Sequence, residues 1–374
     1  MITEPMLVQE VEITGYRSIR RLRFRLRRIN VITGPNGVGK SNLYRALSLL
    51  AGAAQGGLGS AIAEEGGMPS VLWAGRKQKG LDLSPRLGMK LISDEFCYEL
   101  QMGISDQYGT PTAFGLDPSV KEEYVWHGLP RRPSATYFER NKKGIWMMGS
   151  NGKRERFSGE LDDGAPILLQ LQEPHRYPEL SRVRETLKRW RFYHHFDTSA
   201  GSPLRQPQPG VRTPVLDHAG LTLGAALQTV AEHSGGKLGK IVAAALSGAQ
   251  LSIHSGEARF CPELLMPGML RPLSAREFSD GTLRFLCLAA ALLSPSPAPM
   301  LVLNEPETSL HPDLMPALAD LILTASAQSQ IWVITHSPLL ADALSALAPE
   351  MKRMELEKIN GETRIVGEGL IIED

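Results

Sequence analysis

A glycine-rich segment near the start of the chain constrains the possible folds more than any other feature. The run Gly34-Pro-Asn-Gly-Val-Gly-Lys40-Ser41 matches GxxxxGK[ST] and lies between a strand pattern at 29–33 and a helical pattern that ends at Gly52. Glycines at these positions let backbone N–H groups surround phosphate oxygens, and the start of the helix adds a favourable dipole. This context favours a phosphate-binding loop over a glycine-rich turn that contains a lysine by chance.

The end of the chain has the rhythm of a parallel sheet, in which apolar strands alternate with helices. The expected elements are an apolar helix at 282–293, a strand at 300–304, a helix at 312–325 and a strand at 331–335. Asn304 and Glu305 follow the first of these strands, at the carboxyl edge where α/β folds bind ligands. An apolar run that ends in Glu is often structural, but its place after a phosphate-binding loop favours Glu305 as the base that orients and deprotonates a water.

Two further segments could contact phosphate. Ser279 and Gly281 precede the apolar helix, so this helix start could bind an anion or could have an ordinary N-cap. His336 ends the last buried strand, where a γ-phosphate sensor would lie, although a lone histidine is more often structural.

Composition limits the other classes of function. The 374 residues carry a formal net charge of +1, so any nucleic-acid contact must come from a local patch. The three cysteines form no CxxC pair, the N-terminus does not resemble a signal peptide, and the longest apolar run is too short to span a bilayer. We therefore expect a cytoplasmic protein with no membrane contact.

The remaining sequence suggests antiparallel hairpins from 86 to 160 and helices at 164–192 and 221–247, with an irregular stretch at 52–90. One strand carries a row of basic side chains that could contact DNA or could form a solvated sheet face. These are Arg21, Arg23, Arg25 and Arg27. The sequence leaves both interpretations open.

Four segments together resemble the motifs of ABC ATPases. They are GPNGVGKSN (Walker A), EFSDGTLRFL (signature), LVLNEPETSLHP (Walker B and D-loop) and VITHS (H-loop). The start, EITGYRSIRRLRFRLRRINVITG, is similar to SMC, RecF and OLD proteins, and EPETSLHPD is similar to OLD-related ATPases predicted in bacteria. Because the chain ends soon after the H-loop, we expect no Toprim nuclease domain of the OLD type.

This resemblance implies an α/β P-loop NTPase fold, an ABC-ATPase-like head with a parallel core sheet, an antiparallel β subdomain and a helical insert. We expect residues 1–165 and 270–374 to form the nucleotide-binding lobe and residues 166–270 to form a mainly helical insert. The implied cofactors are ATP and Mg²⁺, and the implied assembly is a homodimer that sandwiches two nucleotides.

The resemblance also assigns roles to individual residues. Glu305 is the general base, His336 is the γ-phosphate switch, and the signature acts on the nucleotide of the partner subunit. The residues implied to bind nucleotide are Arg17, Ser18, Gly34, Asn36, Gly37, Gly39, Lys40, Ser41, Asn42, Ser279 and Gly281. Those implied to bind Mg²⁺ are Ser41, Asn304, and Gln172 or Gln170 as the Q-loop residue. Asn304 departs from the family pattern, since a Walker B Asp is expected there.

The sequence therefore favours a slow ATPase that dimerises on ATP and acts in DNA maintenance, DNA repair or phage defence, with a possible effector protein. Asn304 keeps a second class open, a non-catalytic nucleotide-gated sensor or scaffold. The ATPase subunit of a transporter is a third class. The long separation of Walker A from the signature and the wording of EPETSLHP do not favour it.

Overall fold

A computed structural model of the chain describes residues 6–76, 86–105, 112–149 and 151–367. The chain forms two compact units, and neither is continuous in sequence. Unit 1 comprises Met1–Arg27, Gly34–Trp190 and Met354–Asp374, and unit 2 comprises Arg28–Thr33 and Arg191–Arg353.

Unit 1 is built on an antiparallel sheet with the strand order β2-β1-β4-β5-β6-β7-β8-β9. Its strands are β1 (Val8–Tyr16), β2 (Ile19–Arg25), β4 (Leu87–Ser93), β5 (Cys97–Ile104), β6 (Pro118–Trp126), β7 (Thr136–Asn141), β8 (Gly144–Met148) and β9 (Arg154–Arg156). Its helices are α1 (Lys40–Gln55), α2 (Leu58–Glu64), α3 (Met68–Val71), α4 (Ile167–Gln170), α5 (Pro178–Lys188) and the 3₁₀ turn η1 (Pro133–Ala135). The antiparallel hairpins predicted for 86–160 are confirmed, and β1 pairs with β2 in a further antiparallel hairpin.

Helix α1 is longer than its sequence pattern predicts. It continues through Gly52 and ends at Gln55, and the following Gly56, with a φ of 86°, is the left-handed C-cap. Leu49, Ala51 and Ala53 extend its buried face into this last turn, so packing outweighs the low helix propensity of one glycine. The expectation that 52–90 is irregular is also wrong, because α2, α3 and part of β4 lie within it.

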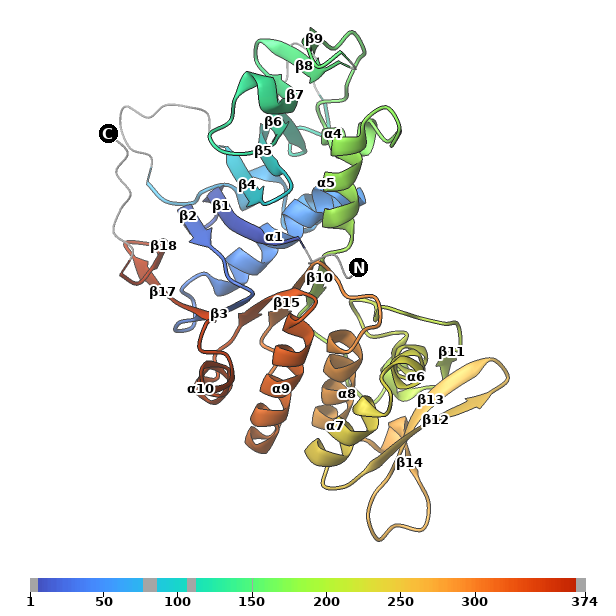
Figure 1. Cartoon of the computed structure of the whole chain (residues 1–374). Helices are drawn as coiled ribbons and strands as arrows, with labels where there is room; N and C mark the ends of the chain where they lie inside the picture. The colour runs from blue at the N-terminus through green and yellow to red at the C-terminus, as the bar shows by residue number, and fades with distance from the viewer. Residues whose placement is uncertain (1–5, 77–85, 106–111, 150, 368–374) are drawn as a thin grey trace. The chain divides into compact units, whose positions relative to one another are not determined.

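Unit 2 contains a parallel sheet with the strand order β10-β15-β16-β3. Its strands are β3 (Ile29–Thr33), β10 (Arg191–Tyr193), β11 (Gln208–Pro209), β12 (Gln250–Gly256), β13 (Arg259–Leu265), β14 (Leu273–Ser274), β15 (Met300–Asn304) and β16 (Gln330–Ile334). Its helices are α6 (Leu223–His233), α7 (Lys237–Ala245), α8 (Asp280–Leu292), α9 (Met315–Ser326) and α10 (Pro338–Leu347), with 3₁₀ turns η2 (Pro203–Arg205), η3 (Ala275–Glu277) and η4 (Pro312–Leu314). Helices α8, α9 and α10 lie side by side along this sheet (Figure 1).

The core of unit 2 explains why its central strands have no polar alternation. Every residue of β15 and of β16 is buried, as expected for parallel strands that are covered on both faces. Because the four strands are parallel, their carboxyl ends meet at one edge of the sheet. The residues that lie at this edge are those that follow Tyr193, Leu303, Ile334 and Ile32.

The predicted lobes have different boundaries from these units. Residues 166–190, with α4 and α5, belong to unit 1, whereas the rest of the predicted insert belongs to unit 2. The insert also contains the β12–β13 hairpin besides its helices. A hairpin of β17 (Lys352–Ile359) and β18 (Glu362–Ile365) follows α10. Among the described residues, no helix is both long and apolar enough to cross a bilayer.

Candidate nucleotide-binding and catalytic site

The phosphate-binding loop in unit 1 requires glycine because the β17–β18 hairpin approaches it closely. At Gly39, φ is 111°, and an added Cβ would lie 2.1 Å from Thr363 Oγ1. At Gly34, an added Cβ would lie 2.5 Å from the carbonyl oxygen of Leu356. A side chain at either position would therefore displace the loop.

Hydrogen bonds from polar side chains hold the same loop in position. Thr363 Oγ1 donates to the Val38 carbonyl at 2.6 Å and lies 2.7 Å from Ser18 Oγ, which accepts from Asn42 Nδ2 at 2.8 Å. Lys358 Nζ donates to the Gly37 carbonyl. Ser18 and Asn42, both expected at the nucleotide, are thus joined to each other and position the loop.

Lys40 is buried, and its Nζ donates to the carbonyls of Gly34 at 2.6 Å and Pro35 at 2.8 Å. The ammonium group therefore lies within the loop that would hold the phosphates. No side chain caps the start of α1, and Ser41 is exposed in its first turn. Since the first N–H groups of a helix have no partner within the helix, this helix start fits a phosphate.

The other predicted contacts of unit 1 are less direct. Asn36 and Gly37 lie exposed at the tip of the loop, where a nucleotide could reach them. Arg17 has a positive φ of 45°, and its guanidinium forms a 2.8 Å ion pair with Glu65. Its role at the nucleotide stays a prediction.

In unit 2, the carboxyl end of β15 holds Asn304, which is 2 % exposed. Its Nδ2 lies 2.6 Å from Nδ1 of His194, the residue that follows β10. Asn304 Oδ1 is also buried and has no hydrogen-bond partner in the described part of the chain. Partial desolvation lowers the pKa of His194, and the nearby Glu305 carboxylate opposes this shift. We did not predict His194 as a site residue.

Glu305 has an unusual backbone conformation. Its φ is 50°, in a region that side chains other than glycine rarely adopt. Its N–H donates to the Ile334 carbonyl at 2.7 Å, and its Oε1 lies 2.8 Å from His336 Nε2. The two residues proposed for catalysis are therefore in contact, and both side chains are about one-third exposed (33 % and 36 %).

Glu307 holds in place the loop of residues 335–337, which carries His336. Its Oε1 accepts from Thr335 Oγ1 at 2.6 Å and from the N–H groups of His336 at 2.8 Å and Ser337 at 3.2 Å. Ser337 in turn caps α10. Sequence reasoning did not single out Glu307, although it lies within the EPET segment.

Arg284 joins the signature helix α8 to this edge. The side chain is buried, and its Nη2 donates to the carbonyls of Glu305 at 2.7 Å and His194 at 3.1 Å. Burial lowers the pKa of the guanidinium, and the Glu307 carboxylate partly offsets this effect. One cation thus stabilises the unusual backbone at Glu305 and fixes the residue that contacts Asn304.

Within the signature segment, Ser279 is the N-cap of α8, which is one of the two roles that the sequence left open. Ser279 Oγ accepts from the N–H of Thr282 at 3.1 Å, and a Cβ at Gly281 would lie 2.6 Å from the Ser309 carbonyl. The buried guanidinium of Arg205 donates to the Phe278 carbonyl at 2.6 Å and to Asp280 Oδ1 at 2.7 Å. Arg205, in the 3₁₀ turn η2, therefore fixes the backbone of the signature.

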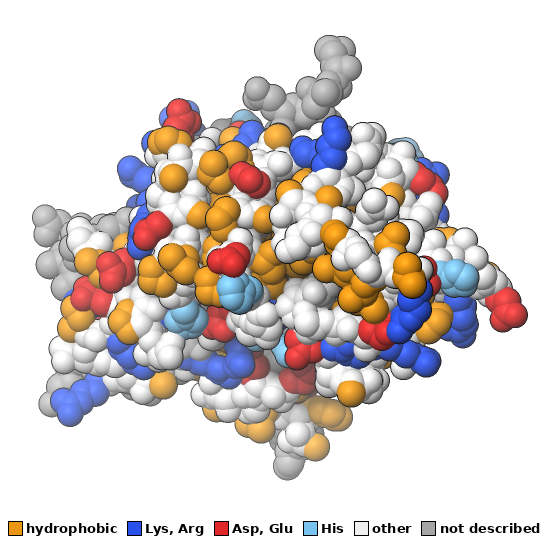
Figure 2. Space-filling model, turned by 90° about the horizontal axis from the view of Figure 1, so that it is seen from below, with side chains coloured by type: hydrophobic (Ala, Val, Ile, Leu, Met, Phe, Trp, Pro, Cys, Tyr) orange, Lys and Arg blue, Asp and Glu red, His pale blue; other side chains and the backbone are white. Residues whose placement is uncertain are grey.

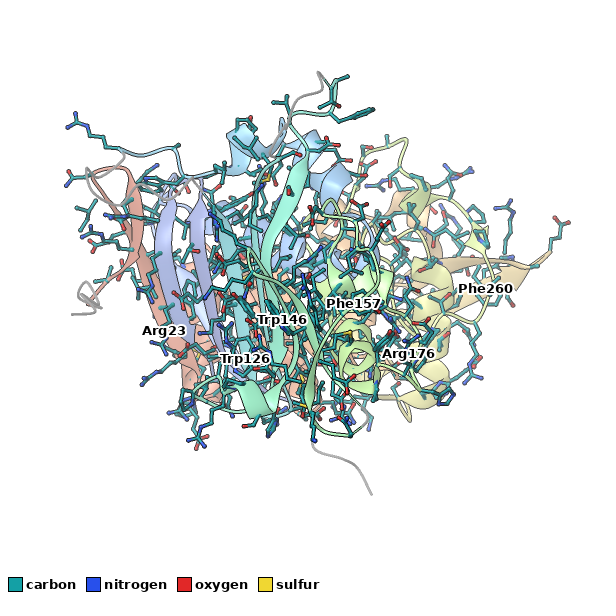
Figure 3. The ribbon with its side chains drawn as sticks, turned by 90° about the horizontal axis from the view of Figure 1, so that it is seen from above. Arg23, Trp126, Trp146, Phe157, Arg176 and Phe260 are labelled. Carbon is teal, nitrogen blue, oxygen red and sulfur yellow. The ribbon has the colours of Figure 1, made fainter. Side chains whose placement is uncertain are left out.

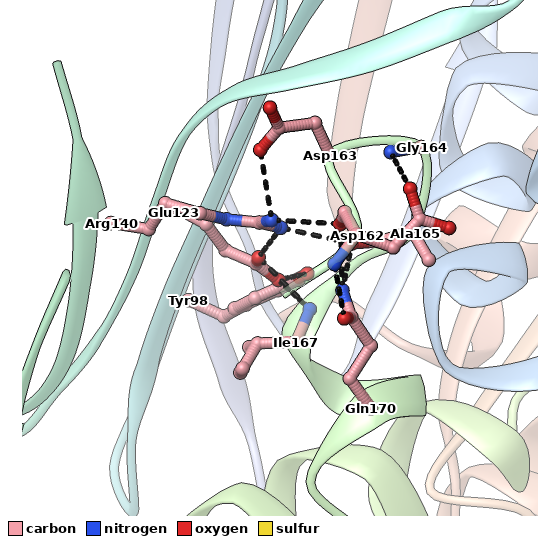
Figure 4. A network of polar contacts seen from close by, with 9 residues as sticks. All are labelled: Tyr98, Glu123, Arg140, Asp162, Asp163, Gly164, Ala165, Ile167 and Gln170. Carbon is pink, nitrogen blue, oxygen red and sulfur yellow. Dashed lines mark hydrogen bonds and ion pairs between the residues drawn. The ribbon is translucent and has the colours of Figure 1, made fainter. Parts of the chain in front are cut away.

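The two Q-loop candidates have different surroundings. The amide of Gln170 is fully used, since it donates to the carbonyls of Asp162 and Ala165 and accepts from the Asp162 N–H (Figure 4). Gln172 is exposed, and its Nε2 donates to the Leu169 carbonyl at 2.6 Å. Gln172 is therefore the better candidate, and its role stays a prediction.

The arginine strand β2 is paired with acidic residues on β1. Arg21 lies 2.7 Å from Glu12, and Arg23 lies 2.6 Å from Glu10, which is also 4.0 Å from Arg25. Arg23 lies on the same sheet as Trp126 and Trp146 (Figure 3). On the face shown in Figure 2, acidic and basic side chains are also interspersed. These pairs favour the solvated-face interpretation of the arginine row.

The described residues contain no group of three or more His, Cys, Asp or Glu side chains that could hold a metal ion. Mg²⁺ is commonly held by one or two protein ligands together with substrate phosphates, so such a group is not required. The exposed Ser41 hydroxyl and the unpartnered Asn304 Oδ1 are oxygen donors of the kind that Mg²⁺ prefers. Each oxygen, taken within its own unit, is therefore chemically suited to Mg²⁺ that arrives with a nucleotide.

The fold and these motifs are those of the head of an ABC-type P-loop ATPase. The chain belongs to the family described as "AAA domain, putative AbiEii toxin, Type IV TA system", whose model matches residues 29–342. No curated protein matches the sequence.

Solved structures show the same fold. An SmcHead bound to the C-winged helix domain of ScpA matches with a TM-score of 0.52 at 15 % identity, over 97 % of this chain and 98 % of that chain. An Smc head domain with an extended coiled coil, bound to the C-terminal domain of ScpA derived from Pyrococcus furiosus, matches with a TM-score of 0.52 at 14 % identity, over 96 % of each chain. The predicted fold class, an α/β ABC-ATPase-like head, is confirmed.

Proposed function

We propose that this protein binds ATP with Mg²⁺ and hydrolyses it slowly to ADP and phosphate. The contact between Glu305 and His336, built on an unusual backbone at the carboxyl edge of the parallel sheet, is the observation that carries this proposal. Chain order supports it further. Strand β3 pairs with β16 in this sheet, and the phosphate-binding loop begins directly after Thr33.

Each residue has a distinct part in the proposed reaction. Lys40 and the first N–H groups of α1 bind the phosphates, and Lys40 exchanges its two carbonyl partners for phosphate oxygens. Glu305 accepts the proton of the attacking water, and His336 fixes the orientation of the carboxylate. Bound Mg²⁺ neutralises the charge that develops on the phosphate oxygens.

Asn304 explains why we propose slow turnover. An amide oxygen can accept a hydrogen bond from a metal-bound water, but the amide adds no negative charge near the metal. The proposed site keeps Glu305, Lys40 and Ser41, so we expect weakened Mg²⁺ binding and not a complete loss of hydrolysis.

We further propose that ATP drives formation of a homodimer in which each signature closes on the nucleotide of the partner. Ser279 and Gly281 line a cavity of about 610 Å³ together with Ser309 and His311, and this cavity could receive part of a second subunit. Replacing Ser279 by Arg should therefore abolish the ATP-dependent dimer without weakening ATP binding to the monomer. The measurement is the mass in solution by light scattering, with and without ATP–Mg²⁺. An Arg at the exposed Ser255 of β12 is the matched control. A dimer that persists in Ser279→Arg would contradict the proposed arrangement.

We also propose a role in phage defence, in a family whose description names a putative AbiEii toxin and a Type IV TA system. We propose that the ATP-gated dimer controls a separate effector protein there, or acts in DNA maintenance or repair. Purification from the native host with its bound partners tests this role, and co-purification of a membrane protein would instead support the transporter class.

The arginine row gives a prediction about DNA. Because Arg21 lies beside Glu12 and Arg25 beside Glu10, replacing Arg21 and Arg25 by Ala should change the affinity for duplex DNA by less than about twofold and leave its salt dependence unaltered. Fluorescence anisotropy at two salt concentrations measures both quantities. A uniform loss of affinity with a flatter salt slope would return these arginines to a DNA-binding role.

A second candidate function is a nucleotide-gated switch that binds ATP without hydrolysing it. The neutral side chain of Asn304 favours this candidate, because the metal site lacks the usual carboxylate. The two functions differ in whether Glu305 affects phosphate release.

A further inference from the structure

The pair of Asn304 and His194 suggests how this chain compensates for the missing Walker B carboxylate. A carboxylate has two equivalent oxygens, so it offers an acceptor in either orientation of the group. An amide has one oxygen and one NH₂ group, so it offers an acceptor in only one of two orientations. At position 304, orientation therefore matters in a way that it would not for a carboxylate.

The structure selects one orientation. Asn304 Nδ2 lies 2.6 Å from His194 Nδ1, and with the amide donating, this ring nitrogen accepts. Asn304 Oδ1 consequently faces away from His194, is buried, and has no partner among the described residues. A buried acceptor without a hydrogen bond is costly, which indicates that this oxygen has a ligand in the working protein.

Two backbone features fix His194 for this contact. Strand β10 pairs in parallel with β15, with Tyr193 opposite Leu303, so the residues that follow them lie side by side at the sheet edge. Arg284 Nη2 also donates to the His194 carbonyl at 3.1 Å and to the Glu305 carbonyl at 2.7 Å. The ring nitrogen is thus held against the amide by the strand ladder and by a buried cation.

We propose that His194 is a positioning residue that orients the Asn304 amide so that Oδ1 serves the Mg²⁺ of the bound nucleotide. The proposal rests on the proposed function, since it requires that the chain binds ATP with Mg²⁺. It assigns to His194 a role in metal affinity and none in nucleotide binding as such. The amide oxygen, held in one orientation, then supplies part of the attraction for Mg²⁺ that a carboxylate would supply at this position.

The test measures the affinity for a fluorescent methylanthraniloyl-ATP in EDTA and in saturating Mg²⁺. The quantity compared among variants is the affinity in Mg²⁺ divided by the affinity in EDTA. His194→Phe keeps the ring shape but removes the acceptor, and the ratio should fall about tenfold while the affinity in EDTA stays unchanged. His194→Asn places an amide oxygen near the position of Nδ1 and should restore the ratio. The neighbouring exposed His195 provides the matched control, since His195→Phe should leave the ratio unchanged.

A double variant tests whether His194 acts through the orientation of the Asn304 amide. In Asn304→Asp, the carboxylate offers an oxygen in both orientations, so adding His194→Phe to this variant should lower the ratio by less than it does in the wild type. If His194→Phe binds with the wild-type ratio, or if the loss is equally large in the Asn304→Asp background, the positioning role is wrong and the proposed function is untouched. If the wild-type protein shows no effect of Mg²⁺ on nucleotide affinity, the proposed function fails, and the role of His194 fails with it.

Discussion

Replacing Glu305 by Gln should lower the rate of phosphate release about 10²–10⁴-fold at saturating ATP and Mg²⁺, which is the usual contribution of a general base. The amide keeps the size of the side chain and can still contact His336 Nε2, which lies 2.8 Å from Oε1 in the wild type. It cannot accept the proton of the attacking water. ATP binding should therefore persist, and the ATP-bound dimer should accumulate because the reaction that opens it is blocked.

The experiment pairs a phosphate-release assay with light scattering of the same samples. Glu350→Gln, at an exposed carboxylate in unit 2, is the control for a general loss of charge and should behave as the wild type. If wild type and Glu305→Gln release phosphate at the same background rate, the protein is a nucleotide-gated switch and not an ATPase. An unchanged mass of Glu305→Gln on addition of ATP–Mg²⁺ would contradict the dimer alone.

The parts of the site that sequence alone predicts are those with local patterns. The loop before α1 was recognisable because the glycine spacing and the strand–helix context are properties of a short segment. Strands β15 and β16 were recognisable because burial on both faces leaves a continuous apolar run. The positions of Glu305 and His336 followed, since Glu305 comes directly after β15 and His336 lies two residues after the end of β16.

His194 and Glu307 escaped prediction because their roles depend on distant residues. Strand β10 has three residues and directly follows a region with a helical pattern, so only its pairing with β15 reveals it as a strand. Glu307 binds backbone N–H groups at 336 and 337, which no local pattern connects to it. The residues proposed to bind ligands were thus easier to predict than the residues proposed to position them.

A buried ion pair in unit 1 should have the largest effect on stability. Glu123 is fully buried, and both of its carboxylate oxygens accept from the Ile167 N–H, at 3.0 Å and 2.9 Å (Figure 4). Tyr98 donates to Oε1 at 2.8 Å, and Arg140 donates to Oε2 at 2.8 Å. Arg140 also donates to the carbonyls of Asp162 and Ala165, so the pair joins strands β5, β6 and β7 to the segment that leads to α4.

Replacing Glu123 by Ala should therefore destabilise the protein by about 3–5 kcal/mol, because it leaves the buried Arg140 guanidinium without its buried carboxylate partner and with only the exposed Asp163 at 3.8 Å. Glu123→Gln should cost less, since its amide oxygen can still accept from Ile167. The comparison is the exposed pair of Arg353 and Asp342, 2.9 Å apart, for which Asp342→Ala should cost no more than about 1 kcal/mol. Urea unfolding gives each free energy, and hydrogen exchange at the Ile167 amide reports whether the segment detaches. If Glu123→Ala lowers the free energy of unfolding by less than Asp342→Ala does, then burial of apolar side chains, and not this ion pair, holds the segment that leads to α4 and Gln172.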